Sequence, residues 1–196
     1  LEDAFPAEVA RSPSTGWIVK DGAMASTGAS RGAIYTARDY THYRLVFQVR
    51  QIAGNHVPGV LIFCTRPAAR GDLAEAQAGI DALGAVQFQV PNGGHWDYRP
   101  GFNKAGAHFT RPIRVRFDLK AWAQVEILVN ARTGVARMAV AQPVGTRAIE
   151  TLVFNDPAAG KPGPIALQMH NAGLFDEFRT LRVEIDPRED RLLTIE

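Results

Sequence analysis

The sequence predicts an all-β protein built from antiparallel sheets, arranged as a two-sheet sandwich or a barrel. Apolar and polar residues alternate in several short segments, and clusters of Gly, Pro, Asn and Asp separate these segments. Only one segment has the composition of a helix. Roughly a dozen short strands with frequent turns are typical of sandwiches and barrels, and not of a parallel sheet with crossover helices. The length of 196 residues suits a single domain, 1–196.

Three segments show the alternation most clearly, at 43–52, 113–119 and 180–186. In 43–52 the apolar positions are Tyr43, Leu45, Phe47 and Val49. Successive side chains of a strand point to opposite faces, so this pattern predicts strands with one buried face and one solvated face. Further strands are expected near 17–20, 33–36, 59–65, 85–90, 123–130, 135–141, 149–154 and 164–169.

Turns and one helix complete the expected elements. The run "NARTG" between 123–130 and 135–141 predicts a hairpin. The segment 71–84 is rich in Ala, Leu and Glu and begins beside a candidate N-cap, Asp72, so it predicts a short helix inserted in a loop. The final run "PREDRLLTIE" is expected to add an edge strand or to fray.

The composition excludes two classes of partner. The 22 basic and 20 acidic residues give a net charge of +2 and are scattered through the chain, so no basic patch predicts nucleic-acid binding. No run of ~18 apolar residues is present, so no membrane span is predicted. The chain begins without Met, which fits removal of a signal peptide or a start at a domain edge.

Polar side chains alternate with apolar ones in two of the predicted strands. Gln87 and Gln89 share one face of 85–90, and Gln168 and His170 share one face of "IALQMHN", 165–171. Amides on the exposed face of a curved sheet would line a groove, and sugar hydroxyls pair with amide groups. We therefore expect a carbohydrate groove, while a plain solvated sheet face stays the alternative.

The stretch "VPNGGHWDYRPGFN", 90–103, has no regular period and is expected to be a loop that leaves this groove. Its chemistry-bearing side chains are those of His95, Trp96, Asp97, Tyr98 and Arg99. The aromatic rings can stack on sugar rings, while the carboxylate and guanidinium can bind hydroxyl groups. The loop is thus predicted to form a rim that holds a sugar, with a rigid structural loop as the alternative.

Several motifs resemble the bacterial 3-keto-disaccharide hydrolase-like domain family. The run "GPIALQMHNAGLFDEFRTLRVEI" resembles the closing motif of that family, with Gly163, Ile165, Leu167, Gln168, His170, Phe178 and Arg179 at the matching positions. "GWIVKDGAM", "RGAIYTARDYTHYRLVFQVR", "GVLIF" and "AWAQVEILVNARTGVARMAV" follow the family in order. The resemblance implies a concanavalin-like jelly-roll sandwich, action on carbohydrate, and a periplasmic or secreted bacterial location.

The sequence departs from this family in one strand. Where the family carries a Glu-Tyr-Gln-Ile-x-Asp pattern, this chain has Gln87 and Asn92 at the two acidic positions. An amide can neither take up a proton as a carboxylate does nor attack as a nucleophile, so a two-carboxylate glycosidase mechanism is not supported here.

Other residues can supply chemistry. His170, His95 and Asp97 are the candidate catalytic groups, because proton abstraction beside a sugar keto group needs a base of moderate pKa. Arg99, Arg31 or a bound cation would stabilise the enolate. The predicted substrate-binding residues are Arg31, Gln87, Gln89, Asn92, Trp96, Tyr98, Arg99, Gln168 and Asn171.

The sequence implies no cofactor, although a divalent cation such as calcium on a peripheral loop would leave no recognisable pattern. Three interpretations of function stay open. The first is a glycoside hydrolase or 3-keto-glycoside lyase, the second is a non-catalytic carbohydrate-binding module or lectin, and the third is a structural or partner-binding envelope protein.

Overall fold

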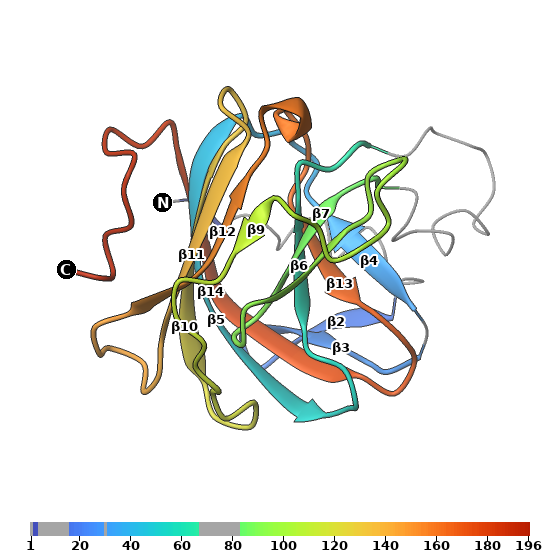
Figure 1. The fold of residues 1–196 in the computed structure, drawn as a ribbon. Coiled ribbons are helices and arrows are strands. Elements are labelled where there is room, and N and C mark those ends of the chain that lie inside the picture. The colour runs from blue at the N-terminus through green and yellow to red at the C-terminus, as the bar shows by residue number, and fades with distance from the viewer. Residues whose placement is uncertain (1, 4–15, 30, 67–82) are drawn as a thin grey trace.

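The computed structural model describes residues 2–3, 16–29, 31–66 and 83–196. Two antiparallel β-sheets face each other, and the predicted all-β sandwich is confirmed (Figure 1). The predicted helix at 71–84 lies outside the described residues except for its last two positions, which form a turn. Pro157–Ala159 forms a single turn of 3-10 helix, η2.

The larger sheet has the strand order β2-β3-β14-β5-β10-β11-β12-β9, and β1 also pairs with β14. Its strands are β1 (Glu2–Asp3), β2 (Trp17–Lys20), β3 (Ala23–Ser26), β5 (His42–Ala53), β9 (Phe109–Thr110), β10 (Ala123–Asn130), β11 (Val135–Ala141), β12 (Ile149–Asn155) and β14 (Phe175–Ile185).

The smaller sheet has the order β4-β13-β6-β7-β8. Its strands are β4 (Gly32–Tyr35), β6 (Gly59–Ile62), β7 (Val86–Gln89), β8 (Gly94–Asp97) and β13 (Ala166–Met169).

One hydrophobic core fills the space between the sheets. The larger sheet contributes Phe47 and Phe178, whose ring centroids lie 5.8 Å apart, and the smaller sheet contributes Phe88 and Leu167, all fully buried. The alternation predicted for 43–52 is confirmed, because Leu45, Phe47 and Val49 all point into this core. Each such side chain stabilises the fold by roughly 1.5–3 kcal/mol through apolar burial.

The strand predicted at 113–119 is not formed. Its alternation is nevertheless real, since Phe117 is buried and Val115 packs against the core. The Phe117 backbone N–H donates to the side chain of Asn92 (2.8 Å), and the Leu119 carbonyl accepts from the N–H of Gln51 (2.7 Å). These scattered partners replace a strand ladder, so the backbone is satisfied without joining either sheet.

The predicted hairpin between β10 and β11 is confirmed, with the strands paired from Gln124–Ala141 to Asn130–Val135. Its turn closes through the N–H of Gly134, which donates to the Asn130 carbonyl (2.9 Å). Gly134 has φ +71°, and a Cβ there would overlap the Asp156 carbonyl. Both conditions favour glycine.

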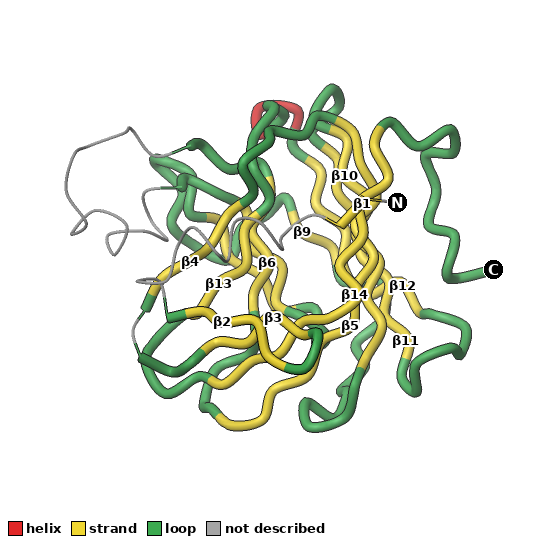
Figure 2. Tube along the Cα trace, turned by 180° about the vertical axis from the view of Figure 1, so that it is seen from behind, coloured by secondary structure: helices red, strands yellow, loops and turns green. Residues whose placement is uncertain are grey.

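The C-terminal segment, 186–196, forms no strand and runs along the outside of the larger sheet (Figure 2). Its anchor is the fully buried carboxylate of Glu126 on β10. This carboxylate accepts from the N–H groups of Leu193 (3.0 Å) and Thr194 (2.8 Å) and from Arg44 Nε (2.8 Å). The segment is therefore fixed by a buried charge and not frayed.

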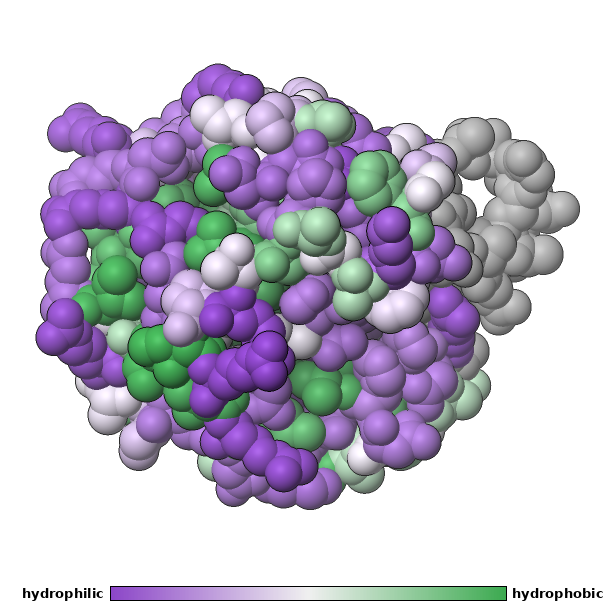
Figure 3. All heavy atoms as spheres, viewed as in Figure 1, coloured by the Kyte–Doolittle hydropathy of each residue, from purple (hydrophilic) through white to green (hydrophobic). Residues whose placement is uncertain are grey.

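The surface seen in Figure 3 is mostly hydrophilic, with separate hydrophobic patches. Within the described part of the chain, no helix is long and apolar enough to cross a membrane.

Candidate functional site

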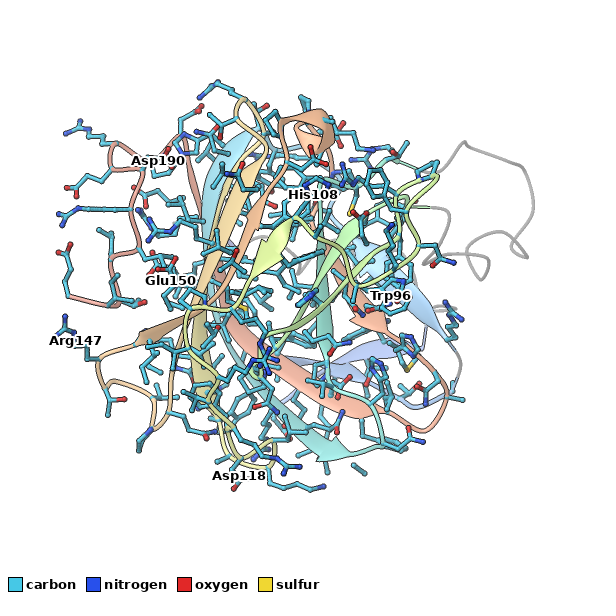
Figure 4. All side chains as sticks on the ribbon, viewed as in Figure 1. Trp96, His108, Asp118, Arg147, Glu150 and Asp190 are labelled. Atoms are coloured by element: carbon cyan, nitrogen blue, oxygen red, sulfur yellow. The ribbon has the colours of Figure 1, made fainter. Side chains whose placement is uncertain are left out.

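A pocket of about 430 Å³ lies on the face of the smaller sheet that points away from the core. This volume falls in the range of ~300–1,000 Å³ that is usual for ligand sites. Figure 4 shows Trp96 over this sheet, far from Asp190 in the C-terminal segment. The described lining residues are Arg31, His56, Gln87, Gln89, Trp96, Tyr98, Asn103 and His170.

Strand alternation places the amides on the outer face. On β7, Val86 and Phe88 point into the core, and Gln87 between them points outward. On β13, Leu167 and Met169 point into the core, and Gln168 between them points outward. The outward position of these amides, inferred from the period-two pattern, therefore agrees with the structure.

The amides form a hydrogen-bonded chain across the sheet. Gln89 Nε2 donates to Gln87 Oε1 (3.3 Å), and Gln87 Nε2 donates to Gln168 Oε1. Strand β6 runs between β7 and β13, and the row of hydrogen-bonded amides can cross this strand because Gly59 has no side chain. A Cβ on Gly59 would overlap Gln168 Oε1. Gln168 Nε2 is buried without a hydrogen-bond partner, so the chain is left with one unused donor.

Aromatic side chains form the wall beside this chain. Trp96 and Tyr98 have ring centroids 6.4 Å apart, with their planes tilted by 46°. The indole Nε1 donates to Asn103 Oδ1 (3.1 Å), which fixes the ring at its polar edge. Each aromatic side chain keeps partial exposure and can offer a ring face to a ligand.

Two histidines stack at the pocket. His56 and His170 have ring centroids 3.8 Å apart and planes within 5°. Nδ1 of His170 lies 3.2 Å from Asn171 Oδ1, and Nδ1 of His56 lies 3.0 Å from the Val57 carbonyl. Both partners are acceptors, so each neutral ring carries its proton on Nδ1 and keeps a lone pair on Nε2. Burial, and then the neighbouring His170, lower the pKa of His56.

His56 and Asn103 belong to the pocket, although the sequence did not indicate either. His56 sits in the turn before β6, and Asn103 has a left-handed backbone with φ 41° in the turn after β8. Both residues lie in turns, where no period-two pattern indicates which way a side chain points. They reach the pocket because the fold brings these two turns together. The nearest available signal was the "NHVPG" turn that leads into a predicted strand.

The prediction of a loop throughout 90–103 is wrong at its centre, because Gly94–Asp97 forms the edge strand β8 and pairs with β7. Alternation therefore divides the five side chains between the two faces. Trp96 and Tyr98 line the pocket, whereas His95 stacks on Phe109 at 4.1 Å on the core side. Burial lowers the pKa of His95, the Gly93 backbone raises it, and Arg111 lowers it.

Asp97 and Arg99 bind each other and hold the turn together. Arg99 donates from Nε (3.0 Å) and Nη2 (2.8 Å) to the fully buried Asp97 carboxylate, and Nη2 also contacts Asp156 Oδ2 (2.7 Å). Burial alone would lower the pKa of Arg99, but hydrogen bonds from the two carboxylates raise it. His95, Asp97 and Arg99 do not line the pocket.

Three other predicted binding residues differ in their position relative to the pocket. Arg31 lines the pocket. Asn171 is half-buried beside it, where its side chain contacts His170 and donates to Asn55 Oδ1 (3.1 Å). Asn92 lies elsewhere, and its side chain accepts from Phe117 (2.8 Å).

A buried carboxylic acid lies behind the histidines. Asp176 Oδ1 accepts from Gln51 Nε2 (2.7 Å), which also donates to the carbonyl of His56 (2.6 Å). Oδ2 of Asp176 has no partner, and burial raises the pKa of this acid to about 7. Among the described residues, no three or more His, Cys, Asp or Glu side chains gather in a way that could hold a metal ion.

Comparison with solved structures places the fold among known sandwiches. A Parabacteroides distasonis protein provisionally named a glycosyl hydrolase superposes with a TM-score of 0.59 at 13% identity, covering 88% of this chain and 91% of its own. The carbohydrate-binding module CBM66 of Bacillus subtilis superposes with a TM-score of 0.61 at 8% identity, covering 87% and 91%.

A search among curated protein sequences finds no significant match. The sequence model of the 3-keto-alpha-glucoside-1,2-lyase-like domain, in contrast, matches residues 4–184. This match spans both sheets, including the strands β7, β8 and β13 that build the pocket. The chain therefore belongs to the 3-keto-alpha-glucoside-1,2-lyase-like domain family.

Proposed function

We propose that this protein binds a carbohydrate in the pocket on the outer face of the smaller sheet. The observation that carries the proposal is the combination of the Trp96–Tyr98 wall with the Gln87–Gln89 amides in one pocket. The C–H face of a sugar ring stacks on an aromatic ring, and its hydroxyl groups both donate to and accept from amides. The family and the sandwich fold shared with a carbohydrate-binding module support the same ligand class.

The pocket also supports a second function, elimination on a 3-keto-glycoside. His170 has a lone pair on Nε2 when its Nδ1 proton faces Asn171. It can remove the C2 proton beside the keto group, and the electron pair then forms the C1–C2 double bond while the C1–O bond breaks. The departing oxygen takes up a proton, and the products are an unsaturated keto sugar and an alcohol. The family match favours this reaction.

Binding is tested by calorimetric titration of neutral and acidic oligosaccharides into the protein. We expect Trp96→Ala to weaken binding about tenfold or more, because the stacking surface is lost. Trp122→Phe is the matched control, since Trp122 lies on Arg50 and Arg179 over the other sheet. Saccharide affinity that is equal in the wild type and in Trp96→Ala would place the site elsewhere.

Turnover is tested separately with 3-keto-glycosides, by the ultraviolet absorbance of the unsaturated product. We expect product from the wild type and at least ~100-fold less from His170→Ala, the usual contribution of a general base. Binding of the 3-keto-glycoside without product would contradict the lyase reaction and would support a carbohydrate-binding module.

A further inference from the structure

The described lining of the pocket is basic. Arg31 carries a positive charge, and His56 and His170 gain one on protonation, while the five other lining residues are amides and aromatics. No Asp or Glu belongs to the described part of the lining. A neutral sugar offers hydroxyl groups that need acceptors as well as donors, and carboxylates are the strongest acceptors among side chains. The charge available in this lining is instead positive, from Arg31 and from histidines that become cationic on protonation.

The basic groups lie together at one end of the smaller sheet. Arg31 directly precedes Gly32, His170 directly follows Met169, and Gly32 and Met169 are paired across β4 and β13. The two side chains therefore leave neighbouring strands at the same end of the sheet. His56 stacks on His170, which brings the third group beside them.

The rest of the pocket is arranged to receive a sugar ring. Trp96 and Tyr98 stand on the edge strand β8 and its extension, three strands away from β13. The pocket thus has an aromatic end and a basic end, joined by the Gln87–Gln89 amides. A ring that stacks at the first end would direct a charged substituent to the second.

We propose that the saccharide bound in this pocket is anionic, with a uronate carboxylate held by Arg31 and the His56–His170 pair. This inference rests on the proposed carbohydrate-binding function. A guanidinium presents N–H groups in a planar fork that matches a carboxylate, and imidazolium groups add charge-assisted hydrogen bonds. The Gln87 and Gln89 amides between the two ends are uncharged and do not repel such a ligand.

The pair also makes the binding dependent on pH. The charged groups around it are Arg31 in the pocket and Asp176, which lies behind the His56 carbonyl with Gln51 between them. Burial and then the neighbouring His170 lower the pKa of His56, so this ring gains its positive charge only below about pH 6.5, while a uronate with a pKa near ~3.5 stays ionised. Uronate affinity is therefore expected to rise as the pH falls from 7.5 to 5.5, and neutral-sugar affinity is not.

The test compares three ligands by calorimetric titration of the full chain. They are aldobiouronic acids with glucuronate or galacturonate, their methyl esters, and the neutral parent disaccharides. We expect the acids to bind about tenfold tighter than the esters at pH 5.5. Arg31→Gln should abolish this preference by weakening the binding of the acids to the level of their esters. Arg132→Gln, at an exposed arginine of the β10–β11 turn, is the matched control and should keep it.

The outcomes separate this inference from the function on which it rests. Esters or neutral disaccharides that bind as tightly as the acids would overturn the anionic ligand and leave the carbohydrate site standing. An acid preference that survives Arg31→Gln would overturn the assigned carboxylate site. No binding of any of the three ligands would overturn the carbohydrate site itself.

Discussion

The imidazole rings of His56 and His170 stack at a centroid distance of 3.8 Å with their planes 5° apart. One ring comes from the turn before β6 and the other from the residue that follows β13, 114 positions later in the chain. Two imidazolium ions at this distance would repel each other, so the pair resists full protonation. Burial, and then the neighbouring His170, therefore lower the pKa of His56.

The lowered pKa of His56 should make the free energy of unfolding depend on pH. The lowered pKa of His56 means that the native state binds fewer protons than the unfolded state below about pH 6.5, so stability is present above that pH and falls as the pH drops. We expect His56→Gln to flatten the decline of the unfolding free energy between pH 7.5 and 5.5, measured in urea. His108→Gln, at a partly exposed histidine beside Asp156, should not flatten it. Equal slopes in the wild type and His56→Gln would contradict the assignment.

The buried Asp176 predicts a pH dependence of the opposite sign. Its pKa is about 7 in the native state and 3.8 in the reference state, so the native state keeps a proton that the unfolded state has lost. Its stabilising contribution is complete below pH 3.8 and is lost as the pH rises to about 7. Asp176→Asn keeps the shape and removes the titration.

We therefore expect the Asp176→Asn variant to gain stability relative to the wild type by up to ~1.4 kcal/mol per pH unit between roughly pH 4 and 7. Urea unfolding across this range measures the difference. Asp118→Asn is the control, because Asp118 is exposed. A stability difference that does not change with pH would show that Asp176 is ionised in the native state over the whole range.

Gly59 is expected to control the amide chain. In Gly59→Ala the new methyl group would overlap Gln168 Oε1 and lie 3.3 Å from Gln87 Nε2, so the hydrogen bond between these amides would break. A buried amide left unpaired costs about 1–3 kcal/mol. We expect the variant to lose this much stability and to bind saccharides at least several-fold more weakly.

Gly32→Ala is the matched control for Gly59→Ala. Gly32 lies on β4 of the same sheet, and a Cβ there would meet no atom within 4 Å. Calorimetric titration and thermal unfolding of the two variants should separate them. Equal behaviour would mean that the amide chain is not needed for the pocket.

Glu126 should hold the C-terminal segment against the larger sheet. Glu126→Gln removes the charge that Arg44 Nε contacts at 2.8 Å and leaves the guanidinium with its exposed partner Glu184. Breaking a buried pair in this way costs roughly 3 kcal/mol. We expect faster hydrogen exchange at Leu193 and Thr194 and lower stability.

The control for this change is Glu150→Gln. Glu150 pairs with Arg137 (2.7 Å) where both side chains are partly exposed, and such a pair contributes about 0–1 kcal/mol. Hydrogen exchange in 190–196 should therefore stay unchanged in Glu150→Gln. Protection that persists in Glu126→Gln would show that other contacts, such as the apolar packing of Leu192 and the hydrogen bond from Ala148 N–H to the Thr194 carbonyl, suffice to hold the segment.

The sequence by itself determined the sandwich and the faces of its strands. Alternation in 43–52 placed Leu45, Phe47 and Val49 in the core, because a period of two leaves no choice once one face is buried. In 180–186 it placed Leu181 and Val183 there correctly, whereas Ile185 of the same face is exposed. The same reasoning put Gln87, Gln89 and Gln168 on the outer face. It could not distinguish the strand ladder of β14 from the unpaired segment 113–119, because alternation reports burial and not hydrogen-bond partners.

Only the tertiary structure decided which side chains meet. Adjacent positions 95–99 looked like one cluster, yet strand β8 sends His95 and Trp96 to opposite faces. His56 and His170, far apart in sequence, came together because their strands are neighbours in the smaller sheet. Strand pairing depends on long-range contacts that a local pattern does not encode. The composition of the pocket, and with it the basic end that we assign to an anionic sugar, follows from that pairing.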